Sequence, residues 1–322
     1  MSKRGNILMT LAEEPDKTTS NHMAVKYSVD EEDCFEFAEG LKDLGYDVHF
    51  VNWNDFNGKQ FSRMFNYNKS RFINPKDIDI MDLIFSYKQE DFLFPENHQR
   101  YSQMISRFER SPAIVVNNPK TIRWNMSKTY LFDLAENGID VIPTYEVDEN
   151  LIERVNQREK FVFKPKIGER GLGQRLVQCS SDLEWLKGQA PHYLAQEFCP
   201  DIRSGERSLV FIGHEFTHAV LKQPNPNDPN EYRCNESRGG TVTLYHPSIE
   251  EFNYANRLLD YVSQRFPIIF SRIDLVDVKG RPVLMEAELL NPSIYANYIG
   301  VGKEFGRKFA NHLDGLIQRG KR

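Results

Sequence analysis

Hydrophobic and polar positions along the chain follow two spacings, which predict alternating strands and helices over residues 1–117. Runs of β-branched and aromatic residues predict strands, and the segments between them carry apolar residues at helical spacing. Because the two kinds of element alternate, we expect a parallel α/β domain with helices on the faces of its sheet. The predicted strands are NILMT, DVHFVNW, IDIMDLIFSY and AIVVNN, and the predicted helices are FEFAEGLKDLGY and RYSQMISRFER.

From residue 118 onward the pattern changes twice, which predicts two α+β units. Residues 118–192 hold two helical stretches, a short strand at PTYEV, a strand–loop–strand segment and a further helix at SDLEWLKGQ. Residues 193–322 hold hairpin-like strands separated by turns, with helices near residues 248–265 and 303–317. We therefore expect a central α+β domain followed by a C-terminal antiparallel-sheet domain.

Composition and charge narrow the class of protein. The 322 residues include 41 basic and 46 acidic side chains, and the net charge of -5 argues against a nucleic-acid partner. No apolar run approaches the ~20 residues that span a bilayer, which argues against a membrane partner. The four cysteines are scattered without a Cys-x-x-Cys pair, which favours reduced thiols and a cytoplasmic location.

The strand–loop–strand segment FVFKPKIGERGLGQRL carries the first candidate chemistry. Its glycines, Gly168, Gly171 and Gly173, fit neither the dinucleotide fingerprint Gly-x-Gly-x-x-Gly nor the Walker A pattern. A flexible loop of this kind either folds over a phosphate, to which it presents backbone N–H groups, or forms an ordinary hairpin turn. A phosphate site here would need partners elsewhere in the chain.

Two lysines are candidate partners for a phosphate. Lys164 ends the apolar run FVFK, and a buried lysine is costly unless it meets an anion. Lys128 lies near the start of a predicted helix. Lys166, two residues further along, is expected at the surface. The alternative for Lys164 is a side chain that extends from the strand end to solvent.

The segment YLAQEFCPDIRSGERS is a candidate nucleoside site. An extended AQEF strand can offer backbone N–H and C=O groups to an adenine edge, and Glu206 is a candidate partner for the ribose hydroxyls. The alternative is a core strand followed by a charged turn.

The strongest pattern is SRIDLVDVKGRPVLMEAELLNPS. Glu286 and Glu288 are two apart on a strand, so they share a face, and Asp274 lies on the strand that pairs with it across the VKGR turn. Carboxylates on one partly buried face repel one another unless a cation holds them, and hard oxygen ligands suit Mg²⁺. The alternative is an acidic outer face of a sheet.

In this order, the motifs resemble the ATP-grasp ligases, in particular the glutathione-synthetase-like branch and its cycloserine-pathway cyclo-ligase subgroup. The resemblance covers roughly residues 118–300 and implies an ATP-grasp fold with a central lid-bearing domain, and with ATP and Mg²⁺ as cofactors. EYRCNESRGG resembles the family's substrate-side pattern and would place Arg233 and Asn235 beside the transferred phosphate. Glu288 stands where the family usually has asparagine, which makes the metal site more negative.

The resemblance also implies roles for the other candidates. Lys128 and Lys164 would bind phosphates, and the glycine loop would be a lid. The implied adenine, ribose and metal residues are Gln196, Glu197 and Phe198 for adenine, Glu206 for the ribose, and Asp274, Glu286 and Glu288 for Mg²⁺.

The implied activity is a carboxylate–amine ligase that acts on an amino acid or small peptide. The γ-phosphoryl group of ATP would activate a carboxylate, and an amine would displace phosphate from the acyl phosphate. Three alternatives stay open: an intramolecular cyclo-ligase, a kinase on the same scaffold and an ATP-binding module without catalysis. A homo-oligomer is common among members of the family.

Candidate substrate contacts outside these motifs are few. Thr10, Glu13 and His22 follow the first predicted strand, where open α/β sheets place ligands, although ordinary loop polarity explains them as well. His218 is either a satisfied core histidine or a substrate contact.

Overall fold

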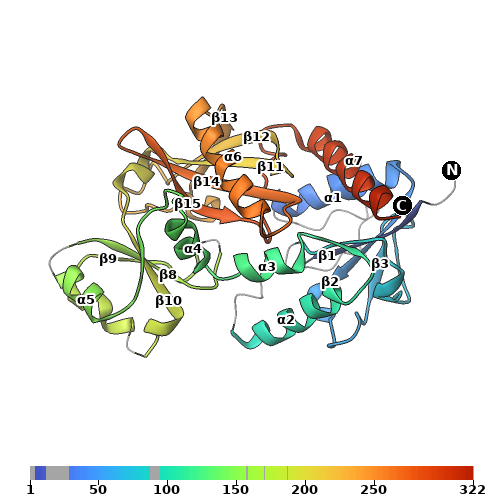
Figure 1. Ribbon diagram of the computed structural model, residues 1–322, viewed down its shortest axis with the longest axis horizontal. Coiled ribbons are helices and arrows are strands. Elements are labelled where there is room, and N and C mark those ends of the chain that lie inside the picture. Colours follow the sequence, from blue (N-terminus) through green and yellow to red (C-terminus); the bar gives the residue numbers. More distant parts are fainter. Residues whose placement is uncertain are drawn as a thin grey trace.

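Three sheets surrounded by helices make up the described part of the chain (Figure 1), which comprises residues 4–11, 29–87, 95–156, 159–169, 171–186 and 188–321. Within these residues, no helix combines the length and apolar character that a membrane crossing requires.

The first sheet has six strands in the order β4-β3-β2-β1-β5-β6. Strands β2, β1, β5 and β6 are parallel, as predicted, whereas β3 and β4 form an antiparallel hairpin that we did not predict. These hairpin strands have three residues each, too few to show a periodic pattern. The strands are β1 Gly5–Leu11, β2 Tyr46–Asn52, β3 Met64–Asn66, β4 Arg71–Ile73, β5 Leu83–Phe85 and β6 Ile114–Val116.

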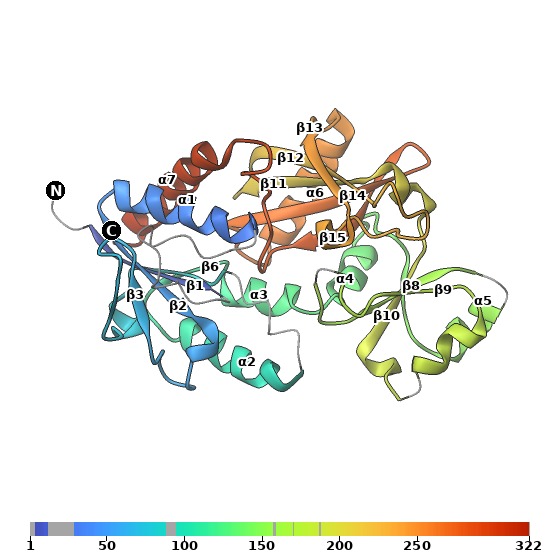
Figure 2. The same cartoon turned by 180° about the vertical axis from the view of Figure 1, so that it is seen from behind.

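Helices cover both faces of this sheet. Helices α1 (Val29–Asp43) and α7 (Gly302–Gly320) lie on one face, and α2 (Pro95–Glu109) lies on the other, as Figure 2 shows. Phe37 of α1 packs against Phe309 of α7, with 4.8 Å between ring centroids. The last helix, which follows the C-terminal unit in sequence, therefore helps to complete the core of the N-terminal sheet.

The central sheet has the order β7-β10-β8-β9, and β10 pairs with both β7 and β8. The boundary that we expected after residue 192 falls directly before β10, so this sheet continues past that boundary. The segment predicted as a helix at SDLEWLKGQ is a 3₁₀ helix over Ser180–Leu186. The elements are β7 Thr144–Glu146, α5 Glu149–Asn156, β8 Phe161–Pro165, β9 Arg175–Val177 and β10 Tyr193–Glu197.

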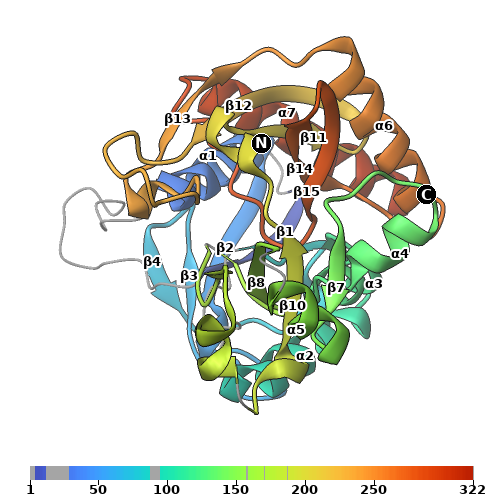
Figure 3. The same ribbon diagram turned by 90° about the vertical axis from the view of Figure 1, so that its left-hand side faces the viewer.

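The C-terminal sheet is antiparallel, as predicted, with the order β13-β12-β11-β14-β15. Figure 3 shows β8 and β10 below β11, β14 and β15, so the central and C-terminal sheets face each other. The strands are β11 Glu206–Ile212, β12 Glu215–Gln223, β13 Thr241–Tyr245, β14 Phe270–Val278 and β15 Arg281–Glu288. The remaining elements are α3 Pro119–Asn125, α4 Tyr130–Glu136, α6 Ile249–Ser263, and 3₁₀ helices at Trp53–Asp55, Ile78–Ile80, Ala190–His192, Pro200–Ser204 and Glu236–Arg238.

Two buried asparagines tie the chain after β6 to the C-terminal sheet. The side-chain amide of Asn117 donates to the carbonyl oxygens of Phe270 and Leu289, at 2.5 and 2.6 Å. The Asn125 amide donates to the Ala287 carbonyl at 2.7 Å and accepts from the N–H of Leu289 at 2.8 Å. Because buried amides are costly to leave unsatisfied, these contacts fix the ends of β14 and β15 relative to the N-terminal sheet.

The close approach of α1 and α7 leads to a stability prediction. A Cβ at Gly306 of α7 would lie 2.5 Å from the Glu36 carbonyl oxygen of α1, whereas the nearest atom to a Cβ at Gly315 is the end of Arg319, at 3.4 Å. We expect Gly306→Ala to lower the free energy of unfolding by about 1–3 kcal/mol because the helices must separate. Gly315→Ala, on the same helix, should raise it by about 0.5–1 kcal/mol. Urea unfolding of both variants is the measurement, and equal effects would contradict this packing.

Candidate active site

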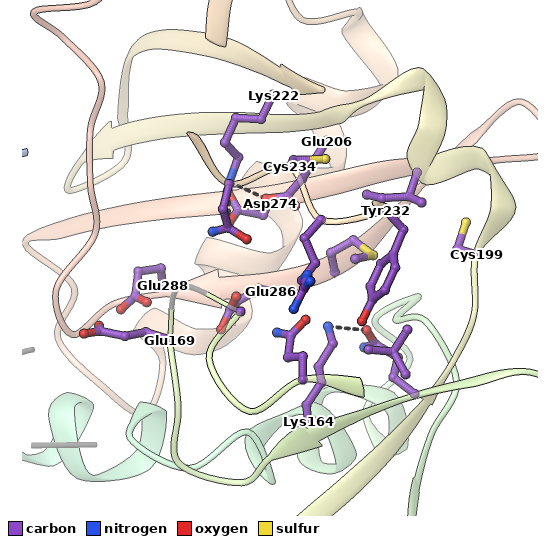
Figure 4. A pocket seen from close by; sticks show the side chains of 18 of the residues that line it. Lys164, Glu169, Cys199, Glu206, Lys222, Tyr232, Cys234, Asp274, Glu286 and Glu288 are labelled. Atoms are coloured by element: carbon purple, nitrogen blue, oxygen red, sulfur yellow. Dashed lines mark hydrogen bonds and ion pairs between the residues drawn. The ribbon is translucent and has the colours of Figure 1, made fainter. Parts of the chain in front are cut away.

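A pocket of about 1090 Å³, including its open mouth, lies between the central and C-terminal sheets (Figure 4). Its walls bring together candidates that are far apart in sequence. The predicted residues that line it are Lys128, Lys164, Gly171, Gln196, Glu197, Phe198, Glu206, Arg233, Asn235, Asp274, Glu286 and Glu288.

Lys128 joins the loop to the carboxylate strand. Its ammonium nitrogen lies 2.6 Å from Glu286 Oε1 and donates to the Gly168 carbonyl at 2.6 Å. Burial disfavours the charge on both partners, but the contact holds the pKa of Lys128 above and that of Glu286 below the ordinary value. The pair is therefore ionised, with Lys128 buried and Glu286 partly exposed.

Lys164 is buried on β8, as predicted, and its ammonium donates to the Gln196 side-chain oxygen at 2.6 Å. Burial lowers the pKa of Lys164, and the charge of Glu286 opposes this effect. Lys166, which follows the end of β8, forms an ion pair with Glu146 at 2.8 Å. Lys164 therefore has a neutral hydrogen-bond partner, so its positive charge can attract an anion bound in the pocket.

Asp274 is enclosed by donors from the protein itself. Oδ1 accepts from the Ser208 hydroxyl at 2.6 Å and from Arg272 Nε at 2.8 Å, and Oδ2 accepts from Arg272 Nη2 at 2.8 Å. Lys222 Nζ lies 3.6 Å from Oδ2. Burial opposes the charge on Asp274, but Arg272 and Lys222 hold the pKa of its carboxyl far below the usual value.

Asp274 pairs with Glu286, and Arg272 with Glu288, across the β14–β15 ladder, so the predicted carboxylates do share a face. Glu288 Oε1 accepts the N–H groups of Leu290 and Asn291, both at 3.0 Å. Burial and the charge of Glu286 raise the pKa of Glu288. Among the described residues, no group of three or more His, Cys, Asp and Glu side chains is arranged to hold a metal ion.

In the segment expected to face an adenine, two backbone N–H groups form hydrogen bonds within the central unit. The N–H groups of Glu197 and Phe198 donate to the carbonyls of Pro143 and Lys160, both at 2.9 Å, because this segment is a central strand of its sheet. The Glu197 carboxylate points away from the pocket to Tyr145, at 2.8 Å, and to Arg154. These two N–H groups are thus engaged by the sheet.

Glu206 makes an ion pair of 2.5 Å with Lys222. Burial raises the pKa of Glu206, and Lys222 opposes that effect. The carboxylate lines the pocket, so it can accept from a hydroxyl on that side.

Arg233 is bound within its own loop. Its Nε and Nη2 donate to the two carboxylate oxygens of Glu231, each at 2.7 Å. This contact, stronger than the opposing effect of partial burial, raises the pKa of Arg233. Glu231 therefore fixes the plane of the guanidinium at the pocket wall.

The glycine loop contacts this segment. Gly171 has φ +64°, and a Cβ there would lie 2.9 Å from Asn235 Oδ1 and 3.1 Å from Arg233 Cδ. Gly173 has φ +70° and packs against Pro165 and Tyr193 rather than lining the pocket. Gly168 contributes its carbonyl to Lys128. Only glycine adopts these left-handed conformations without strain.

Sequence reasoning missed Lys222, Arg272 and Tyr295, which also line the pocket. Arg272 lies two residues before Asp274 on the same strand, so the sequence could have predicted that the two side chains share a face. Tyr295 has a positive φ of 57°, and its ring lies under Lys222 and Arg272, at 5.7 and 5.8 Å. Nothing in its sequence neighbourhood indicates this placement.

Thr10 and His218 are not part of the pocket lining. The Thr10 hydroxyl donates to the Tyr87 carbonyl at 2.7 Å, and Glu13 and His22 fall outside the described residues. His218 is buried, and its Nε2 lies 2.7 Å from the Ile294 carbonyl. It is thus a satisfied core histidine that supports the segment carrying Tyr295.

No family model matches the chain. Glutathione synthetase of Agrobacterium fabrum is 26% identical over 208 residues, which are 63% of this chain and 63% of that protein. The cycloserine biosynthesis protein DcsG of Streptomyces lavendulae is 27% identical over 246 residues, 67% of this chain and 79% of that protein.

Solved structures show the fold. D-cycloserine synthetase DcsG has a TM-score of 0.73 at 17% identity, covering 97% of this chain and 100% of that one. A Chryseobacterium gregarium ATP-grasp ligase, solved with ADP and with leader and core peptides, has a TM-score of 0.64 at 12% identity and covers 97% of each chain. The chain therefore has the ATP-grasp fold, and its sequence is similar to glutathione synthetase and to DcsG.

The buried contacts of Asp274 lead to a pH-dependent prediction. We expect Asp274→Asn to cost about 3–5 kcal/mol of unfolding free energy, because it leaves buried cations without a counter-charge. A carboxyl with a depressed folded pKa stabilises above its unfolded pKa of about 4, and the contribution falls as the pH drops toward the folded pKa.

The measurement is urea unfolding from neutral pH downward, with the exposed Asp260→Asn as control. The gap between wild type and Asp274→Asn should be constant down to about pH 4 and narrow only below it. A gap that already closes between neutral pH and about pH 6 would contradict the assignment.

Proposed function

We propose that this chain, which has the ATP-grasp fold of the ligases it resembles, is an ATP-dependent carboxylate–amine ligase. It would form an amide bond through an acyl phosphate and release ADP and phosphate. The observation that carries the proposal is one pocket in which cations from separate elements converge on an acidic strand. These cations are Lys128, Lys164, Lys222, Arg233 and Arg272.

The pocket has the two ends that a nucleoside triphosphate needs. Apolar and aromatic side chains gather toward one end, where Phe198 and Tyr232 are in edge contact at 5.8 Å between centroids, with Ile202 and Met285 in the same lining. Lysines 128 and 164 and the glycine loop lie toward the other end. We assign the apolar end to adenine, the Glu206 carboxylate to the ribose and the lysine end to the phosphates.

The acidic strand fits Mg²⁺ through two carboxylates. Glu286 and Glu288 share a face and offer hard oxygen donors, and Mg²⁺ is commonly bound by one or two carboxylates together with substrate phosphates. Both oxygens of Asp274 are already hydrogen-bonded, so we assign it to orienting Arg272 and Lys222. When bound, the metal would offset negative charge on the phosphates.

The chain's own groups would carry the rest of the chemistry. Lys128, Lys164 and Arg233 would stabilise the charge that spreads over the transferred phosphoryl group. The glycine loop, which contacts Asn235 and Arg233 through Gly171, would cover the acyl phosphate and exclude water. The amine then forms the C–N bond as the carboxyl carbon releases phosphate.

The substrates in this proposal are small: an amino acid or a short peptide supplies the carboxylate or the amine. Intramolecular ring closure is the second candidate, favoured by the similarity of the whole chain to D-cycloserine synthetase DcsG. The described cysteines, Cys34, Cys179, Cys199 and Cys234, are free thiols, which supports our further proposal of an intracellular site of action.

Trapping of the acyl phosphate tests the function. The enzyme is incubated with MgATP and pools of amino acids and small carboxylates, with and without hydroxylamine, and ADP, phosphate and hydroxamates are measured. ADP that appears only with a particular acid, together with its hydroxamate, is the expected result. A phosphorylated product without hydroxamate would indicate a kinase, and ATP binding without turnover in every pool would favour a binding module. A product formed from one substrate without added amine would identify ring closure.

Lys164 gives a test of the nucleotide site. Lys164→Ala should raise the dissociation constant for ATP roughly ten- to a hundredfold, the effect of losing a hydrogen bond to a charged group. Lys166→Ala, just after β8, is the matched control and should bind ATP as wild type does, because the Lys166 side chain pairs with Glu146 and is not part of the pocket lining. Calorimetric titration with a non-hydrolysable ATP analogue measures both. Equal affinities for all three proteins would remove the lysine from the site.

A further inference from the structure

Three carboxylates gather around Lys128 at one end of the pocket. Glu169 of the glycine loop, Glu286 and Glu288 all raise the pKa of Lys128 against the effect of burial. Glu286 is paired with this lysine at 2.6 Å. Among the described residues, Glu288 makes no ion pair. Arg272 and Lys128 are the described cations that lower the pKa of Glu288. We call Glu169, Glu286 and Glu288, which gather beside Lys128, the acidic corner.

Asn291 connects two of these carboxylates. Its backbone N–H donates to Glu288 Oε1 at 3.0 Å, and its side-chain amide nitrogen donates to Glu169 Oε2, also at 3.0 Å. Figure 4 shows Glu169 and Glu288 on the same side of the pocket, reached from the loop and from the end of β15. The corner therefore forms only when the loop and the segment after β15 lie together.

Asn291 also leaves an acceptor unused. The side chain is 6% exposed, and its Oδ1 has no hydrogen-bond partner in the described part of the chain. A carboxylate only accepts hydrogen bonds, so the contact with Glu169 fixes the amide nitrogen on that side and identifies the other atom as oxygen. Since buried acceptors are normally satisfied, Oδ1 marks the place of a donor that the described residues do not supply.

We propose that Asn291 and Glu169, with the charge of Glu288 behind them, bind the primary ammonium group of an amino-acid substrate. An ammonium group carries three N–H donors and a positive charge, which match a carbonyl acceptor beside carboxylates. Glu286 and Glu288 are the oxygen donors that we assign to the metal, whereas Asn291 Oδ1 and Glu169 lie at the loop side of that pair. The ammonium subsite rests on the proposed ligase function and names the chemistry of its substrate.

Two sources could supply this ammonium: the attacking amino acid, or the α-ammonium group of the acid that is phosphorylated. Hydroxylamine separates them, because it is uncharged at neutral pH and replaces the amine in the hydroxamate assay. The hydroxamate reaction therefore depends on the acid's own ammonium group but not on that of the second substrate.

The experiment compares wild type, Asn291→Ala and Glu169→Gln, with the exposed Glu304→Gln as the matched carboxylate-to-amide control. KM is measured for ATP, for the acid and for the amino-acid nucleophile, in both the amide-forming and the hydroxamate reactions. Both pocket variants should raise one amino-acid KM roughly ten- to a hundredfold and leave the KM of ATP unchanged. Thermal melting verifies that the variants are folded.

Each outcome has one meaning. A rise confined to the amide-forming reaction assigns the ammonium to the nucleophile, and a rise in the acid's KM in both reactions assigns it to the acid. Unchanged amino-acid KM values, or a rise limited to the KM of ATP and the Mg²⁺ requirement, would overturn the subsite while leaving the ligase assignment intact. Absence of ADP and hydroxamate with wild-type protein would instead reject the proposed function, before any variant is compared.

Discussion

The ion pair between the buried Lys128 and the partly exposed Glu286 is the interaction on which the geometry of the site depends. One ammonium group touches the carboxylate of β15 and the Gly168 carbonyl, so it joins the C-terminal sheet to the glycine loop. The buried lysine charge would be costly without this partner. The central unit, which supplies Lys128 and the loop, is thereby held at a fixed distance from the carboxylate strand.

The same reasoning explains why the sequence was informative here. Burial makes every unpaired charge expensive, so a lysine at the end of FVFK and two glutamates inside VLMEAEL indicate a site rather than a surface. The strand parities of Glu286, Glu288 and Asp274 followed directly from the period of two. The alternation of strands and helices likewise predicted the parallel part of the first sheet.

What the sequence did not reveal depends on contacts between distant segments. The backbone N–H groups of Glu197 and Phe198 donate to the carbonyls of Pro143 and Lys160, and no local sequence pattern predicts these contacts. The β3–β4 hairpin is too short for periodicity, and α7 packs on α1 across most of the chain length. Asn291 resembles any turn residue in its NPS context until its two carboxylate neighbours are known.

The groups of the pocket are positioned in two ways, by neighbours in the same segment or by contacts with the glycine loop. Arg233 is held by Glu231 and Asp274 by Arg272, so these groups are positioned before any ligand binds. The loop residues Gly168, Glu169 and Gly171 instead contact Lys128, Asn291 and the Arg233 segment, which belong to other parts of the pocket wall. A loop fastened at these three points encloses the pocket only as a unit. The placement of the loop therefore depends on residues that lie far apart in the sequence.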